Sequence, residues 1–263
     1  MARVARFSCD KGVLYGVLRG DAVHIIEGDL LGTWHESDTV LPLSSVRLLA
    51  PVAPPNVVAI GLNYRKHAEE SQMALPDRPV IFFKTTTAVC GPEDPIVLPR
   101  MAPAEVDYEC ELTIVIGKRA KNVSPERALD FVLGYTCGND VSARDCQLRE
   151  DTQWARGKSF DTFAPIGPWI ETDLDPDHLH VVTRLNGEVM QDSSTSDLIF
   201  PCRELIAYLS RAMTLLPGTI IMTGTPSGVG FARKPPVFLR PGDRVEIEIE
   251  GIGTLGNPVV AEG

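Results

Sequence analysis

Four acidic residues occupy alternate positions of one otherwise apolar stretch: Glu105, Asp107, Glu109 and Glu111. If residues 105–116 form a strand, these carboxylates share one face, because successive side chains point to opposite sides of a strand. Crowding like charges on one face costs electrostatic energy, which a hard divalent cation with oxygen ligands would relieve. The alternative interpretation is the solvated outer face of an amphipathic strand.

A further carboxylate, Asp140, follows a later strand-forming segment. Together with Glu109 and Glu111, at i and i+2 of the first strand, it would supply three oxygen ligands from two strands. Such a set leaves open positions for water or substrate, as a catalytic Mg²⁺ or Mn²⁺ requires. Glu105 and Asp107 lie nearer the entry of the strand, and we expect them to support the site or to be solvated.

His67 and Glu70 are the candidates for acid–base chemistry. At i and i+3 of a helical turn, the two side chains meet on one face. A carboxylate beside an imidazole fixes its tautomer and raises its basicity, as a general base acting on water requires. A surface histidine–glutamate pair without catalytic function is the competing interpretation.

Arg144, Gln147 and Lys158 could bind an anionic substrate. The two cations would neutralise a carboxylate or a developing enolate, and the amide would add a hydrogen bond. The glycine-rich turn 224–228 adds backbone N–H groups and the hydroxyl of Thr225. This turn lacks the lysine of a phosphate-binding loop, so we do not expect nucleotide binding.

The composition is that of an acidic globular protein. The chain has 263 residues, a net charge of −10 and 44% hydrophobic residues, and these values do not favour nucleic-acid or anionic-membrane binding. No apolar run approaches the ~18–20 residues of a membrane span. The N-terminus resembles no secretory signal, so we expect a cytoplasmic protein with reduced thiols. None of its cysteines forms a CxxC pair: Cys9, Cys90, Cys110, Cys137, Cys146 and Cys202.

The chain divides at a proline-rich segment, residues 50–55, through which no helix can propagate. Before it, residues 3–26 alternate as paired strands, and residues 39–49 also favour strands. We therefore expect a small N-terminal β-rich domain at 1–50 and a catalytic domain at 55–263.

The second part is predicted to be mainly β with a few helices (α+β), because its strands do not alternate regularly with helices. The Asn186-Gly187 pair predicts a type I′ hairpin over residues 181–191, and residues 244–249 are typical of an edge strand. Residues 156–159 are predicted to be a loop. Three helices are expected, at 124–134, 142–154 and 201–216.

Several segments resemble the signature blocks of the fumarylacetoacetate hydrolase family, in the family's order. They cover the chain from about residue 55 onward, and the first ~50 residues resemble the small N-terminal domain of some bacterial members. Phe83-Lys84 and Gly91-Pro92 fit as well. The main blocks are Asp-Tyr-Glu-Cys-Glu-Leu at 107–112, Gly-Asn-Asp-Val-Ser-Ala-Arg-Asp-Cys-Gln at 138–147, Gly-Lys-Ser-Phe-Asp at 157–161 and Thr-Gly-Thr-Pro-Ser-Gly at 223–228.

This resemblance implies a mixed β-roll, usually as a homodimer. It implies a metal site at Glu109, Glu111 and Asp140, with Gln147, Lys158 and Thr225 lining the substrate site. It also implies that residues 63–70 form a mobile lid carrying His67 and Glu70, for which Gly61 is a plausible hinge. Cys110 should point into the core.

The implied chemistry is metal-assisted hydrolysis of a C–C bond in an acylpyruvate-like or related 2-oxo/β-dicarbonyl acid. In it the His67–Glu70 dyad would activate water, and Lys158 would stabilise negative charge, with Arg144 or Gln147 orienting the substrate. The alternative is an isomerase or decarboxylase of 2-hydroxyhepta-2,4-diene-1,7-dioate (hydroxymuconate) type in aromatic catabolism, or an oxaloacetate decarboxylase. A cation-binding homologue without turnover is the third interpretation.

Overall fold

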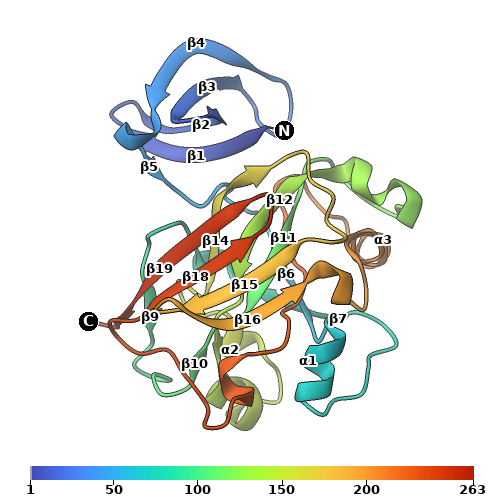
Figure 1. The fold of residues 1–263 in the computed structure, drawn as a ribbon. Coiled ribbons are helices and arrows are strands. Elements are labelled where there is room, and N and C mark those ends of the chain that lie inside the picture. Colours follow the sequence, from blue (N-terminus) through green and yellow to red (C-terminus); the bar gives the residue numbers. More distant parts are fainter. Residues whose placement is uncertain (1) are drawn as a thin grey trace.

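The computed structural model describes residues 2–263, which fold mainly into strands with few, short helices (Figure 1). The α-helices are α1 (Arg65–Glu70), α2 (Ala155–Lys158) and α3 (Cys202–Ala212). The largest sheet contains β1 (Arg3–Cys9), β2 (Gly12–Arg19), β3 (Ala22–Gly28), β4 (Trp34–Pro42), β5 (Arg47–Leu48), β6 (Val57–Gly61), β7 (Val80–Lys84), β8 (Val89–Cys90), β11 (Cys110–Ile116), β12 (Val132–Asn139), β14 (Ala164–Glu171) and β17 (Ile220–Met222). A second sheet contains β9 (Ile96–Leu98), β15 (His180–Leu185), β16 (Glu188–Ser194), β18 (Arg244–Ile249) and β19 (Gly253–Ala261), and β10 (Val106–Asp107) pairs with β13 (Ser142–Ala143).

Within residues 2–263 the largest sheet has twelve strands, in the order β4-β3-β2-β1-β14-β12-β11-β17-β6-β7, with β5 on β1 and β8 on β14. The second sheet has the order β16-β15-β18-β19-β9. Its strands β15, β18 and β19 contact β11, β12 and β14, so the two sheets close on one apolar core (Figure 1). This is the predicted mainly β, α+β class, arranged as the mixed β-roll that the resemblance implies.

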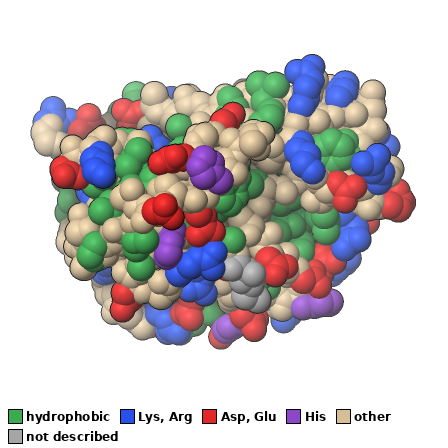
Figure 2. All heavy atoms as spheres, turned by 90° about the horizontal axis from the view of Figure 1, so that it is seen from above, with side chains coloured by type: hydrophobic (Ala, Val, Ile, Leu, Met, Phe, Trp, Pro, Cys, Tyr) green, Lys and Arg blue, Asp and Glu red, His purple; other side chains and the backbone are tan. Residues whose placement is uncertain are grey.

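The N-terminal strands β1 to β5 lie together at the top of Figure 1. They are joined to the rest because β1 pairs with β14, with Arg3 opposite Glu171 and Val4 opposite Ile170. Acidic and basic side chains are interspersed over the face seen from this end (Figure 2). None of the helices in residues 2–263 is long and apolar enough to cross a bilayer.

The acidic stretch is not the single strand that period-two alternation predicts. It divides into β10 and β11, with Tyr108 and Glu109 between them. The two parts pair with different partners, β13 for β10 and β12 with β17 for β11. The Asp107 carboxylate accepts the N–H of Tyr108 at 2.9 Å, which stabilises the break. Both sides of β11 are buried, so alternation alone could not reveal its environment.

Of the predicted helix 142–154 only residues 144–150 are helical, and the predicted loop 156–159 is wrong. Ser142 and Ala143 form β13, a π-helical turn spans Cys146–Glu150, and α2 includes Lys158. Pairing of β13 with β10 takes the first residues out of any helix. Gly157 permits α2 to pack closely, since a Cβ there would lie 2.9 Å from the carbonyl oxygen of Ala143.

Two other predicted helices are shorter than expected, and one strand has a different position. A 3₁₀ helix spans Pro125–Phe131, while Gly134 lies inside β12, where a Cβ would meet the carbonyl oxygen of Glu171 at 2.4 Å. The helix expected at 201–216 is α3 and ends at Ala212. Strand β18 is interior, because it pairs with both β15 and β19. The predicted hairpin is confirmed: Asn186 (φ 53°) and Gly187 (φ 85°) have the positive φ of a type I′ turn.

Candidate active site

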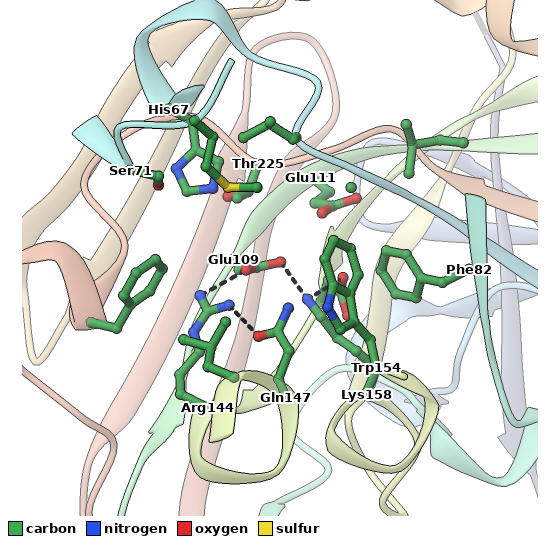
Figure 3. Close-up of a pocket in the computed structure, with 17 residues that line it drawn as sticks. His67, Ser71, Phe82, Glu109, Glu111, Arg144, Gln147, Trp154, Lys158 and Thr225 are labelled. Carbon is green, nitrogen blue, oxygen red and sulfur yellow. Dashed lines mark hydrogen bonds and ion pairs between the residues drawn. The ribbon is translucent and has the colours of Figure 1, made fainter. Parts of the chain in front are cut away.

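One cavity of about 100 Å³ collects most of the side chains predicted to do chemistry (Figure 3). Ile60, Leu62, Phe82, Trp154 and Phe231 contribute to its apolar wall. Its polar lining contains His67, Glu109, Glu111, Asp140, Arg144, Gln147, Lys158 and Thr225. Glu70 does not line the cavity, but its carboxylate contacts the imidazole of His67.

The register of β11 and β12 brings three carboxylates together. Cys110 lies opposite Asn139 and Glu111 opposite Gly138, so Asp140 meets the two glutamates as soon as β12 ends. The N–H of Asp140 donates to the carbonyl of Glu109 at 2.9 Å, which fixes this approach. Glu109, Glu111 and Asp140 are buried and bring carboxylate oxygens within 4.8 Å of one another.

The donor set of this triad fits a hard divalent cation. Glu111 accepts the N–H of Gly224 at 2.8 Å, yet within residues 2–263 it forms no ion pair with a lysine or arginine. Burial, and then the charges of Asp140 and Glu109, raise the pKa of Glu111 well above its ordinary value. Three carboxylates without sulfur or imidazole suit Mg²⁺ or Mn²⁺ better than a soft metal.

Two lysines compensate the rest of this negative charge. Lys158 Nζ lies 2.8 Å from Glu109 Oε2 and 2.7 Å from Asp140 Oδ2, while Lys84 Nζ lies 2.5 Å from Asp140 Oδ1. Burial acts to raise the pKa of Glu109, but Lys158 and Arg144 outweigh it and hold this pKa at about 2. Burial also lowers the pKa of Lys84, against the attraction of Asp140. For Lys158 the carboxylates outweigh burial and raise the pKa.

Arg144 is held by a carboxylate that the sequence left unassigned. Its Nε donates to Asp107 Oδ2 at 2.9 Å, and its other nitrogens reach Glu109 Oε1 at 2.7 Å and Gln147 Oε1 at 2.8 Å. The guanidinium also stacks over Phe231, 4.5 Å from the ring centroid. The group is therefore fixed in orientation at the edge of the cavity, as recognition of a substrate carboxylate requires.

His67 and Glu70 form the predicted pair on α1. His67 Nδ1 lies 2.8 Å from Glu70 Oε1, which leaves Nε2 as the ring nitrogen that Glu70 does not engage. The carboxylate of Glu70 also accepts the N–H of Gly228, at 3.0 Å from each of its oxygens. These contacts hold the pair against the loop after β17, and His67 lies beside Thr225 (Figure 3).

Comparison with known proteins identifies the family. Residues 56–260 match the family model described as fumarylacetoacetate (FAA) hydrolase C-terminal, and residues 2–51 match one described as Rv2993c-like, N-terminal. The chain belongs to the fumarylacetoacetate hydrolase family. The resemblance of its signature blocks is therefore confirmed.

Family members of known sequence and structure are similar over most of their length. A fumarylacetoacetate hydrolase domain-containing protein 2 homolog of Dictyostelium discoideum is 51% identical over 232 residues, covering 83% of this chain and 76% of that protein. The mitochondrial oxaloacetate tautomerase FAHD2A of Homo sapiens is 47% identical over 226 residues, covering 84% and 72%. The crystal structure of 2-hydroxyhepta-2,4-diene-1,7-dioate isomerase from Mycobacterium marinum superimposes with a TM-score of 0.90 at 44% identity, covering 100% of both chains.

Relatives of this kind in the fumarylacetoacetate hydrolase family are enzymes, and the activities they are named for are tautomerisation and isomerisation. They correspond to the alternative activity that the sequence suggested more closely than to its leading one. Hydrolysis of a C–C bond is not confirmed and stays a prediction.

Two charged residues of this family member's site were missed or undervalued. Lys84 is buried against Asp140 and, although Phe83-Lys84 fits a family block, no spacing argument assigned it a partner. Asp107 is fully buried and bound to Arg144, whereas Glu105 pairs with Arg149 at 2.6 Å near the surface. Cys110 is fully buried, as predicted.

Proposed function

We propose that this protein is a divalent-cation-dependent tautomerase or isomerase of a short 2-oxo dicarboxylic acid. The observation that carries the proposal is the buried triad Glu109–Glu111–Asp140, which shares one small cavity with the cationic side chains of Arg144 and Lys158. The activities named for the human and mycobacterial relatives support the choice of reaction.

We assign the metal site to Glu109, Glu111 and Asp140, for Mg²⁺ or Mn²⁺. When bound, the cation would supply Lewis-acid polarisation of the 2-oxo group. Lys158 would stabilise negative charge that develops on the substrate oxygen, because its ammonium group is already held between Glu109 and Asp140. Arg144, Gln147 and Thr225 would bind the carboxylates and keep the substrate in one orientation.

His67 is the proposed proton carrier. Its Nε2 would take a proton from C3 of the keto acid, and the imidazolium so formed would return that proton to the 2-oxygen to complete the enol. The reverse transfer returns the keto form. Glu70 would hold the imidazole through Nδ1 and so fix its orientation and tautomer.

The leading hypothesis from the sequence, hydrolysis of an acylpyruvate-like acid, remains a second candidate. The His67–Glu70 pair favours it, because an imidazole oriented by a carboxylate at a cavity can activate water. Decarboxylation of oxaloacetate would use the same divalent cation and Lys158, but it would need no base to activate water.

Residues 1–50 and 55–263 are proposed to be an accessory β-rich domain and the catalytic domain, and the separate family matches at 2–51 and 56–260 support this division. We expect the protein to be cytoplasmic and to form a homodimer. Light scattering of the purified protein would test its oligomeric state.

The deciding experiment is a substrate panel assayed with and without EDTA. Enol oxaloacetate, a hydroxymuconate analogue and an acylpyruvate are each followed by ultraviolet absorbance with added Mg²⁺ or Mn²⁺. We expect rapid tautomerisation or isomerisation of a diacid, lost in EDTA and restored by the cation. Undiminished activity in EDTA would overturn the metal assignment. A protein that binds Mn²⁺ but converts none of the panel would support the inert interpretation.

A further inference from the structure

Gln191 lies outside the residues assigned so far, yet its side chain connects three parts of the site. It is 1% exposed and projects from β16 toward β11 and the loop after β17. Its Oε1 accepts the N–H of Cys110 at 2.9 Å and the hydroxyl of Thr183 at 2.7 Å. Its Nε2 donates to Thr225 Oγ at 2.8 Å and to the carbonyl of Pro226 at 2.9 Å.

These partners fix which end of the amide is which. A backbone N–H such as that of Cys110 can only donate, so the atom facing it must be the amide oxygen. A backbone carbonyl such as that of Pro226 can only accept, so the atom facing it must be the amide nitrogen. Inverting the amide would set donor against donor and acceptor against acceptor in a fully buried place, at a large energetic cost.

The fixed amide determines the polarity of Thr225. Because Nε2 of Gln191 has only hydrogens to offer, Thr225 Oγ accepts in this contact and keeps its own hydrogen for another partner. Within residues 2–263 the structure gives this hydrogen no acceptor. Thr225 is 4% exposed and lines the cavity, between His67 and Glu111 in Figure 3. The cavity is therefore where this hydrogen finds its acceptor.

The same amide supports the strand that carries the candidate metal ligands. Strand β17 pairs with β11 only from Thr113 to Val115, so it does not reach the N–H of Cys110. Gln191 takes over as the acceptor for this N–H, between Glu109 and Glu111. The Thr225 hydroxyl and the ligand strand are thus positioned by one side chain.

We propose that Gln191 is a positioning residue that presents Thr225 as a hydrogen-bond donor to a substrate carboxylate. The cavity would favour a group with an acceptor at this point, whereas an ammonium group, which can only donate, would face another donor. The inference rests on the proposed function, because it needs a carboxylate-bearing substrate in the cavity.

The test measures binding of oxalate, an acceptor-only dianion, to the full-length Mn²⁺-loaded protein by titration calorimetry. Gln191→Glu keeps the shape of the side chain but replaces its donor with a second acceptor, so the Thr225 hydroxyl turns away from the cavity to donate to it. We expect the oxalate Kd to rise about tenfold, as for loss of one hydrogen bond to a charged group. Thr225→Val should have the same effect, and the double variant should be no weaker than either single variant.

A matched control comes from the other end of the amide. Thr183→Val removes the hydrogen bond to Oε1 and leaves the Nε2 contact with Thr225 in place, so it should lower thermal stability while oxalate Kd stays within twofold. Gln191→Leu, with no polar atoms, frees the Thr225 hydroxyl and serves if Gln191→Glu does not fold. It should raise Kd severalfold and also be non-additive with Thr225→Val.

The outcomes separate this inference from the proposed function. In the variants KM for the substrate should rise with kcat nearly constant, a split that general loss of structure would not give. If the increases in oxalate Kd from substitutions at positions 191 and 225 multiply in the double variant, the positioning role is wrong. It is also wrong if Thr183→Val raises the oxalate Kd as much as Gln191→Glu does. If oxalate binds and the effects are non-additive but no diacid is converted, only the proposed reaction is overturned. If the wild type binds no oxalate, both fail.

Discussion

Lys84 Nζ lies 2.5 Å from Asp140 Oδ1, and this contact is completely buried. The lysine also donates to the carbonyl of Val141 at 3.1 Å, so its position is fixed by two acceptors. Asp140 thus has a cation on each oxygen, Lys84 on one and Lys158 on the other. A carboxylate with two such partners is held in one orientation, facing Glu109 and Glu111.

Replacing Lys84 with methionine should therefore destabilise the protein strongly. Removing one member of a buried ion pair typically costs about 3–5 kcal/mol, because the remaining charge is uncompensated. Urea unfolding of metal-free Lys84→Met should show a loss of about 3 kcal/mol, and saturating Mn²⁺ should reduce it by neutralising Asp140. Arg149→Met is the control, since its pair with Glu105 is largely exposed and screened by water, so its loss should be much smaller. Equal losses in both variants would contradict the prediction.

Cation binding should strengthen as pH rises, because of Glu111. Its pKa in the folded protein is raised above the ordinary 4.5, first by burial and then by Asp140 and Glu109. Between these two pKa values the folded state holds more protons than the unfolded state, so the unfolding free energy of the metal-free protein falls with rising pH. Mn²⁺ requires the carboxylate, so its Kd should also fall with rising pH, and binding should release a proton.

Calorimetry in buffers of different ionisation enthalpy measures the released proton. Glu111→Gln should flatten the decline of metal-free stability above pH 4.5. Glu109 does not confuse this measurement, because its lowered pKa of about 2 affects stability only below the ordinary 4.5, and with the opposite sign. An unchanged slope in Glu111→Gln would refute the assignment.

His67→Ala separates the candidate reactions. Loss of a general acid–base group should slow tautomerisation by about 100-fold or more, and acylpyruvate hydrolysis likewise if it occurs. Decarboxylation of oxaloacetate should persist, because it needs no base to activate water. His180→Ala is the matched control: His180 lies 2.7 Å from Asp192 in a comparable but exposed pair. Tautomerisation that survives His67→Ala would show that another group moves the proton.

Asp107→Asn should impair both stability and substrate binding. Its Oδ2 accepts from Arg144 Nε and the N–H of Phe231, while Oδ1 accepts the N–H groups of Tyr108 and Gly230. An amide nitrogen in place of one oxygen would face donors in a fully buried position. We expect the unfolding free energy to fall by about 3 kcal/mol and KM to rise as Arg144 loses its support.

Asp130→Asn is the corresponding control, since Asp130 forms an exposed pair with Arg127 at 3.2 Å. Its unfolding free energy should change by less than about 0.5 kcal/mol. If Asp107→Asn lowers the unfolding free energy no more than Asp130→Asn does, Arg144 is held by its other contacts.

The sequence by itself determined the family, the fold class and the chemistry of the residues. Signature blocks such as 107–112 and 138–147 carry residue types whose chemistry is local: carboxylates bind hard cations, and a histidine beside a glutamate at i+3 meets it on one helical face. Turn chemistry is equally local, so Asn186-Gly187 predicted its hairpin.

Only the tertiary structure decided which charges face one another. Glu105, Asp107, Glu109 and Glu111 look alike in the sequence, yet a break at Tyr108–Glu109 leaves Glu105 near the surface and Asp107 under Arg144. Lys84 and Gln191 acquire their partners from segments 56 and 81 residues away. Strand pairing sets such contacts, and pairing depends on the whole chain because it buries the apolar faces together, so no local pattern reveals it.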